Sequence, residues 1–151
     1  MIITLPLYNF IKKKIKILFI IMIVKIILIS IILLSLDFIY LNITKNNNLE
    51  QILRIQGTKL DMKLYGAILC YITLVFGIYY FIIKNGKSSS EAFILGLVIY
   101  GVYDFTNYAI FSEWSAKSVF IDVIWGGILF GLTTEFTYAI LDCLYANKIK
   151  K

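Results

Sequence analysis

The stretch Ile17–Leu41, ILFIIMIVKIILISIILLSLDFIYL, decides the fold, because it is almost entirely apolar and only Lys25 and Asp37 in it are charged. A hydrocarbon core of about 30 Å needs about 20 apolar residues in a helix. We therefore expect a transmembrane helix over residues 20–41, with Lys25 close enough to its inner end to reach the headgroups. A signal peptide is the rival interpretation, but no small-residue cleavage site follows the apolar core.

Three further apolar stretches follow, at about residues 64–83, 92–111 and 118–141. The chain is 60% hydrophobic, above the roughly 45–50% of soluble domains. We therefore predict an all-α integral membrane bundle of four transmembrane helices over residues 17–141. A basic arm, 1–16, in which Pro6 breaks any early helix, precedes it, and a basic tail, 142–151, follows. Residues 42–63 are expected to form a polar loop with a short interfacial helix near Leu49–Gly57.

The net charge of +6 comes from lysines that flank the apolar segments. In such positions lysines act as topology signals and meet anionic lipid headgroups, so we expect the lipid bilayer as a partner and no nucleic acid. The arm, the 84–91 turn and the tail carry nine Lys and Arg residues, against five in the other two loops. This asymmetry predicts cytosolic N and C termini.

Three aspartates, Asp37, Asp104 and Asp122, lie inside the predicted spans. A carboxylate in hydrocarbon costs roughly 2.5–3.5 kcal/mol on insertion scales, so such residues usually face a bundle interior and mark a site. At 1.5 Å per residue, all three lie roughly 6–11 Å from the outer ends of their helices. Carboxylates at one level on three helices can converge. The competing interpretation is that they are hydrated near the interface or, for Asp122, stabilise a helix N-terminus.

Each aspartate is followed three residues later by a side chain that can donate a hydrogen bond or exclude lipid. Residues three or four apart share one helix face, and the same spacing places Tyr100 beside Asp104. The candidate ligand- or ion-binding residues are therefore Asp37, Tyr40, Tyr100, Asp104, Asn107, Asp122 and Trp125.

Two other features of the helices concern packing. Gly127 and Gly131 form a small-x-x-x-small face that suits close helix contact. Glu135 lies in the inner half of the fourth span, at the depth of Lys25 in the first, and the two are a candidate ion pair.

The chain has no histidine, which removes the commonest general base and transition-metal ligand. Cys70 and Cys143 belong to no metal or redox spacing motif, and we interpret them as small apolar residues. No catalytic residue is assigned, no cofactor is expected, and the sequence does not decide whether a metal binds.

Several of these residues form motifs that resemble an uncharacterised family of four-span membrane proteins, domain of unknown function 2177. The motifs are Leu36-Asp37-x-x-Tyr40-Leu41, Tyr100-Gly101-x-Tyr103-Asp104-x-Thr106-Asn107, Trp114 and Asp122-x-x-Trp125-Gly126, and the resemblance covers about residues 30–141. It implies a four-helix membrane protein with Asp37, Asp104, Asn107, Asp122 and Trp125 as family positions. It implies no activity.

Three functions fit these observations. The interpretation that we favour is a small proton- or cation-linked transporter using the intramembrane aspartates, for which four helices enclose little volume and a homodimer would be needed. The alternative is a structural or accessory membrane protein whose aspartates make interhelical hydrogen bonds. The second alternative, a lipid-acting membrane enzyme, has less support because the chain carries no nucleophile motif.

Overall fold

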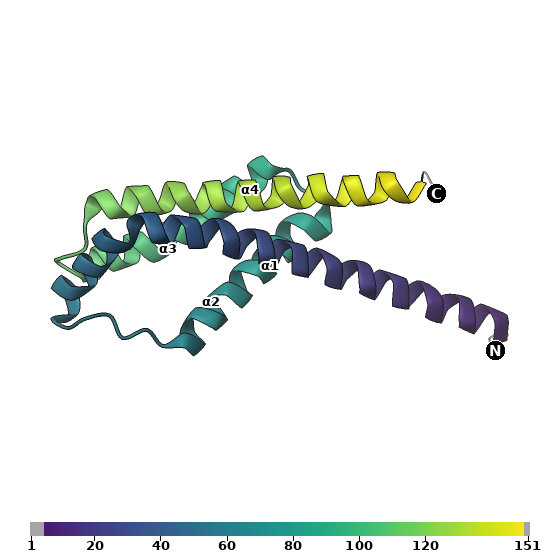
Figure 1. Cartoon of the computed structure of the whole chain (residues 1–151), viewed down its shortest axis with the longest axis horizontal. Helices are drawn as coiled ribbons and strands as arrows, with labels where there is room; N and C mark the ends of the chain where they lie inside the picture. Colours follow the sequence, from purple (N-terminus) through teal and green to yellow (C-terminus); the bar gives the residue numbers. More distant parts are fainter. Residues whose placement is uncertain (1–4, 150–151) are drawn as a thin grey trace.

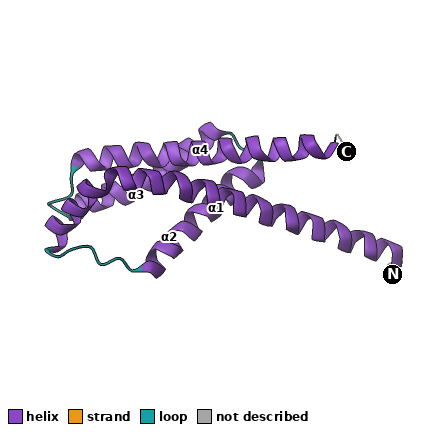
Figure 2. Ribbon diagram, in the orientation of Figure 1, coloured by secondary structure: helices purple, strands orange, loops and turns teal. Residues whose placement is uncertain are grey.

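A computed structural model describes residues 5–149 as helices joined by short loops, with no strand in that range (Figures 1 and 2). The four long helices are α1 (Leu5–Gln56), α2 (Leu64–Gly77), α3 (Ser89–Ile110) and α4 (Ala116–Ile149). Two short elements continue α2, a π-helix, η1 (Ile78–Ile82), and a 3-10 helix, η2 (Ile83–Asn85). Four of the described segments are long and apolar enough to cross a membrane, which confirms the predicted fold class.

Helix α1 is longer at both ends than the sequence suggested. Pro6 does not break it, because Pro6 lies in the first turn, where the missing N–H would have no helical partner anyway. Residues 1–4 of the predicted arm lie outside the described residues. At the other end the helix continues through the expected polar loop to Gln56, so only residues 57–63 connect α1 to α2.

Side chains in the polar segment of α1 explain why it stays helical. Asn42 Nδ2 donates to the carbonyl of Phe38 at 2.6 Å, and Thr44 Oγ1 donates to the carbonyl of Tyr40 at 3.0 Å. Asn48 Nδ2 donates to Thr44 Oγ1 at 3.1 Å. Each bond satisfies a polar group one turn back along the same helix, so these residues need not leave the helix to find partners.

The turn between the second and third spans falls where Gly86 predicts it. Gly86 ends η2 with a φ of 63°, a left-handed conformation that side chains rarely adopt. The Ser88 hydroxyl then accepts from the backbone N–H of Glu91, whose carboxylate accepts from the N–H of Ser88, forming a capping box. This box starts α3 at Ser89, three residues before the expected span.

Helices α3 and α4 form an antiparallel pair, with α1 packed on α4 and on α2 (Figure 1). Glycines allow the close approach of the pair. A Cβ on Gly96 would clash with the carbonyl oxygen of Gly126, and a Cβ on Gly126 would clash with the Tyr100 ring. The predicted pair, Gly127 and Gly131, faces α3 in the same chain, but the tightest contact lies at Gly126.

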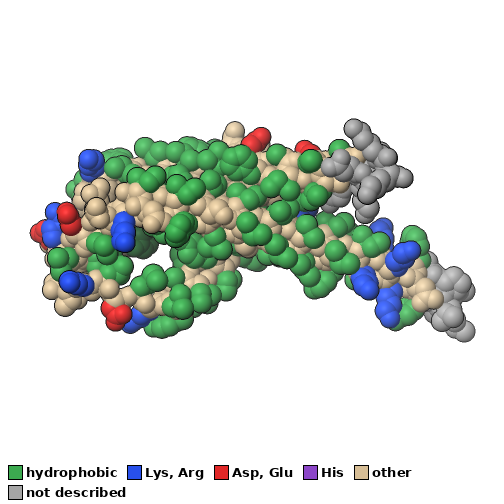
Figure 3. Space-filling view, viewed as in Figure 1, with side chains coloured by type: hydrophobic (Ala, Val, Ile, Leu, Met, Phe, Trp, Pro, Cys, Tyr) green, Lys and Arg blue, Asp and Glu red, His purple; other side chains and the backbone are tan. Residues whose placement is uncertain are grey.

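Charged and apolar surfaces are separated along the long axis of the molecule. Most of the Lys and Arg side chains in Figure 3 lie near its two ends, and the surface between them is mainly hydrophobic. The N-terminal part of α1 extends beyond the other helices, with Lys12, Lys13, Lys14 and Lys16 exposed. Such a surface suits a bilayer as solvent.

Replacing Gly126 with Ala tests the close contact of α3 with α4. The added methyl group meets the Tyr100 ring, and overpacking of this kind typically costs about 1–3 kcal/mol of unfolding free energy. Denaturant unfolding in micelles measures it. Gly131→Ala is the matched control on the same helix, because its Cβ would meet the Ser89 carbonyl oxygen at an ordinary 3.5 Å. Equal losses for both variants would contradict the contact.

Candidate functional site

The three intramembrane aspartates line one cavity of about 260 Å³. Asp37 comes from α1, Asp104 from α3 and Asp122 from α4, so three helices each contribute one carboxyl group. Tyr40 and Tyr100, two other residues singled out from the sequence, line it as well. The remaining lining residues are Leu41, Asn48, Gln51, Ile52, Tyr103 and Trp114.

Asp37 is buried, and both of its carboxylate oxygens accept hydrogen bonds. The Tyr71 hydroxyl donates to Oδ2 at 2.7 Å, and the Trp125 indole Nε1 donates to Oδ1 at 3.0 Å. The side chain is 6% exposed. A carboxylate with a donor on each oxygen is stable away from water, and here the donors come from α2 and α4. Asp37 therefore connects three helices.

Asp122 is held by the aromatic pair of Tyr40 and Trp125. The Tyr40 hydroxyl donates to Asp122 Oδ1, and the Tyr40 ring stacks on Trp125 with a centroid distance of 4.4 Å and an interplanar angle of 9°. The same Trp125 also donates to Asp37, so one stacked pair serves two carboxyl groups. This arrangement orients both acids toward the interior of the bundle.

Asp104 differs from the other two aspartates. Its side chain is 1% exposed, and neither carboxylate oxygen accepts a well-formed hydrogen bond from the described residues, although the Trp114 indole lies beside it. The amide Nδ2 of Asn107 and the indole Nε1 of Trp114 are also buried without an acceptor within the described range. Buried polar groups are nearly always paired in proteins, so Asp104 and Trp114, which both line the cavity, mark it as a candidate site for a proton or a small ligand. Asn107, a residue predicted for the site, does not line the cavity.

The polar end of the cavity is formed by residues that the sequence placed in a loop. Asn48 and Gln51 belong to the extension of α1, and the Gln51 Oε1 accepts from the backbone N–H of Ser115 at 3.2 Å. This bond joins the end of α1 to the turn before α4. The sequence spacing could have identified this extension, because positions 37, 41, 48 and 52, which line the cavity, lie on one face of a continuous helix.

Lys25 and Glu135, the candidate ion pair, are not paired in the described structure. Glu135 instead accepts a hydrogen bond from the Ser89 hydroxyl, and no ion pair between the two forms within the described residues. Lys25 lines a separate cavity with Lys84 and Tyr79, and Glu135 is not among its lining residues. Equal depth in the membrane did not place the two side chains on facing sides of their helices.

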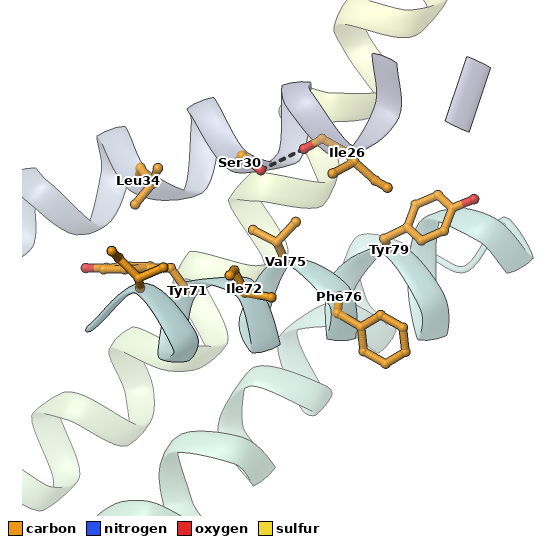
Figure 4. A pocket seen from close by; sticks show the side chains of 9 residues that line it. Ile26, Ser30, Leu34, Tyr71, Ile72, Val75, Phe76 and Tyr79 are labelled. Carbon is orange, nitrogen blue, oxygen red and sulfur yellow. Dashed lines mark hydrogen bonds between the residues drawn. The ribbon is translucent and has the colours of Figure 1, made fainter. Parts of the chain in front are cut away.

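An apolar groove of about 470 Å³ runs between α1 and α2, lined by side chains that include Ile26, Leu34 and Phe76 (Figure 4). Its Ser30 hydroxyl is satisfied by the carbonyl of Ile26 at 2.9 Å. Tyr71 also lines this groove, and its hydroxyl bonds Asp37. Tyr71 thus separates the groove from the carboxylate cavity.

Four apolar helices around a polar cavity define a multi-pass membrane protein. The chain belongs to the family described as Predicted membrane protein (DUF2177), whose profile matches residues 21–139. The match includes every residue that lines the carboxylate cavity. No curated protein and no solved structure matches the chain.

Tyr71→Phe tests the polar attachment of α2 to the bundle. The change deletes only the hydroxyl that donates to Asp37, and hydrogen bonds between membrane helices contribute about 0.6–1.7 kcal/mol. We expect unfolding free energy to fall by that amount in micelles. Tyr65→Phe, on the same helix and 66% exposed, should cause little change. An unaltered Tyr71→Phe protein would show that the bond does not stabilise the bundle.

A double-mutant cycle tests the partner of Glu135. We expect Ser89→Ala and Glu135→Leu to be non-additive by about 0.5 kcal/mol or more, because each change removes the same hydrogen bond. Lys25→Gln and Glu135→Gln should be additive within about 0.3–0.5 kcal/mol. Unfolding free energies in micelles supply all the terms. The reverse pattern would restore the ion pair with Lys25.

Proposed function

We propose that this chain is a small membrane transporter that binds a proton or a cation at the carboxylate cavity. The observation that carries the proposal is Asp104, whose two buried oxygens accept no well-formed hydrogen bond from the described residues and which shares its cavity with Asp122 and the Trp114 indole. A permanently unpaired carboxylate in a bundle would be costly. A group that exchanges a proton or a cation has its partner for part of its cycle.

The charge balance of the cavity supports uptake of positive charge. Three of its lining residues are acidic and none is Lys or Arg. Like charges at short range oppose one another's ionisation, so the cavity favours a proton or a cation over an anion. Asp37 has two donors of its own and is already satisfied. The exchange is therefore assigned to Asp104 and Asp122.

Access to the cavity follows from its place along the helices. Its polar end is formed by Asn48 and Gln51, which follow the apolar part of α1. The lysine distribution predicts cytosolic termini, and with this orientation the cavity would open to the opposite face of the membrane. Toward the cytosol the buried side chains of Ile29, Leu33 and Phe130 close the bundle. A cycle that releases cargo there requires these helices to move or a second copy to complete the path.

A structural or accessory role is the second candidate, and the bonding of Asp37 favours it. Two donors from two other helices are what an interhelical packing group requires. The lipid-acting enzyme has no comparable support. Within the described residues, no group of three or more acidic or cysteine side chains is arranged to hold a metal ion.

Carboxyl infrared bands of the protein in liposomes, followed while pH and cations are varied, distinguish the two candidates. We expect a band that titrates or shifts with a cation in the native protein and is absent in Asp104→Asn, which keeps the shape of the side chain but cannot ionise. Cation-driven proton flux, measured with an internal pH dye, should be lost in the same variant. Asp142→Asn, an exposed position on α4, is the control and should keep both.

The opposite result is equally clear. Bands that remain silent from acid to alkaline pH, with equal flux in the native protein and in Asp104→Asn, would overturn the transport proposal and leave the structural role.

A further inference from the structure

Aromatic rings line the carboxylate cavity alongside its acids. Tyr40, Tyr100, Tyr103 and Trp114 contribute four rings, and Trp125 stacks on the first of them. Tyr103 and Trp114 meet edge to face with a centroid distance of 6.1 Å. The faces of Trp and Tyr attract cations, and aromatic cages are the usual means of binding substituted ammonium groups. The combination of rings and carboxylates suits an organic cation.

A bare metal ion fits this cavity less well. Hard cations need several oxygen ligands that converge at about 2.0–2.6 Å, and the described acidic residues form no such group. One of the acids, Asp37, already has both of its oxygens occupied. A cavity of about 260 Å³ also offers room for a substituted ammonium group. Asp104, which is buried at 1% exposed and lines the cavity, supplies its counter-charge.

An apolar groove of about 550 Å³ lies beside the cavity, between α2 and α3. The two spaces share Tyr100 and Tyr103, which line both. The rest of the groove is formed mainly by apolar side chains, with Gly66 at the start of α2. A Cβ on Gly66 would have nothing within 4 Å, so the groove is open at that point. An apolar substituent attached to a bound cation has space there.

We propose that the ligand of this site is an organic ammonium ion with an apolar substituent, its charged group beside Asp104 and its substituent in the groove between α2 and α3. The inference rests on the proposed function and names the ligand class of that same site. The groove faces the bilayer along α2, where Leu69 is 61% exposed. An amphipathic cation can therefore reach the carboxylates sideways from the lipid as well as from water.

Tryptophan fluorescence gives a direct test, because the chain has two tryptophans and both lie at the site. The full chain in non-ionic maltoside micelles is titrated with tetramethylammonium, butyltrimethylammonium, Na⁺ and K⁺ at constant ionic strength. We expect saturable changes with the ammonium ions at half-saturating concentrations at least tenfold below those of Na⁺ and K⁺. Butyltrimethylammonium should bind more tightly than tetramethylammonium, by up to about fourfold per buried methylene.

Two pairs of variants locate the charged group and the substituent. Asp104→Asn should raise the half-saturating concentration of tetramethylammonium at least tenfold, and Asp142→Asn should leave it unchanged. Gly66→Leu should remove the advantage of the butyl group without affecting tetramethylammonium, because it fills only the groove. Ser30→Leu, which fills the other groove beside α1 (Figure 4), should preserve that advantage.

Nanodiscs separate the two sources of such a cation. If the site takes a lipid headgroup, phosphatidylcholine nanodiscs will suppress the response to added tetramethylammonium and phosphatidylglycerol nanodiscs will not. If it takes a free ion, both will respond.

The failures are distinguishable as well. This inference would be overturned if Na⁺ or K⁺ bound as tightly as the ammonium ions, or if the butyl group gave no gain in affinity. The proposed function would still stand in that case, provided that the carboxyl band of Asp104 titrates. A protein without response to any cation and with silent carboxyl bands would overturn both.

Discussion

The close approach of α3 to α4 determines the rest of the bundle. Where the carbonyl of Gly126 lies against Gly96, the two backbones leave no room for a side chain, and the Tyr100 ring is held over the bare surface of Gly126. This contact fixes the rotation of both helices about their axes. Asp104 lies one turn beyond Tyr100, and Asp122 one turn before Gly126, so fixing the rotation directs both carboxyl groups to the same side. The partners from α1 and α2 then complete the cavity.

The common level of the three aspartates along the bundle could be predicted from the sequence, because position along a helix converts directly into distance. The rotation of each helix about its axis, which decides which side chains face one another, could not be predicted in this way. Lys25 and Glu135 share a depth but not a facing side. Tyr71 was missed for the same reason, since the second span is apolar all round and no periodicity marks the face that meets Asp37.

The boundaries failed for a different reason. Composition predicted a loop over residues 42–63, where asparagine and threonine side chains instead bond to the helix that carries them. Local hydrogen bonds of this kind make a polar segment compatible with a helix, and composition alone does not reveal them. Because residues 42–63 were predicted to form a loop, Asn48 and Gln51 were not included in the predicted site. The three aspartates could be identified from the sequence because a charged residue within an apolar span is costly and therefore rare.

The extension of α1 beyond the apolar stretch has a consequence for how such a chain can change. Insertion into a bilayer depends on hydropathy and on the placement of lysines. The uncharged amide side chains on the extended part of α1 affect neither property strongly. The three aspartates lie in the apolar segments, where most polar substitutions would oppose membrane insertion. Asn48 and Gln51 lie beyond the apolar stretch of α1, where this constraint is weaker. Substitution of Asn48 can therefore change the polarity of this end of the cavity without disturbing membrane insertion, whereas Gln51 also holds α1 to the turn before α4.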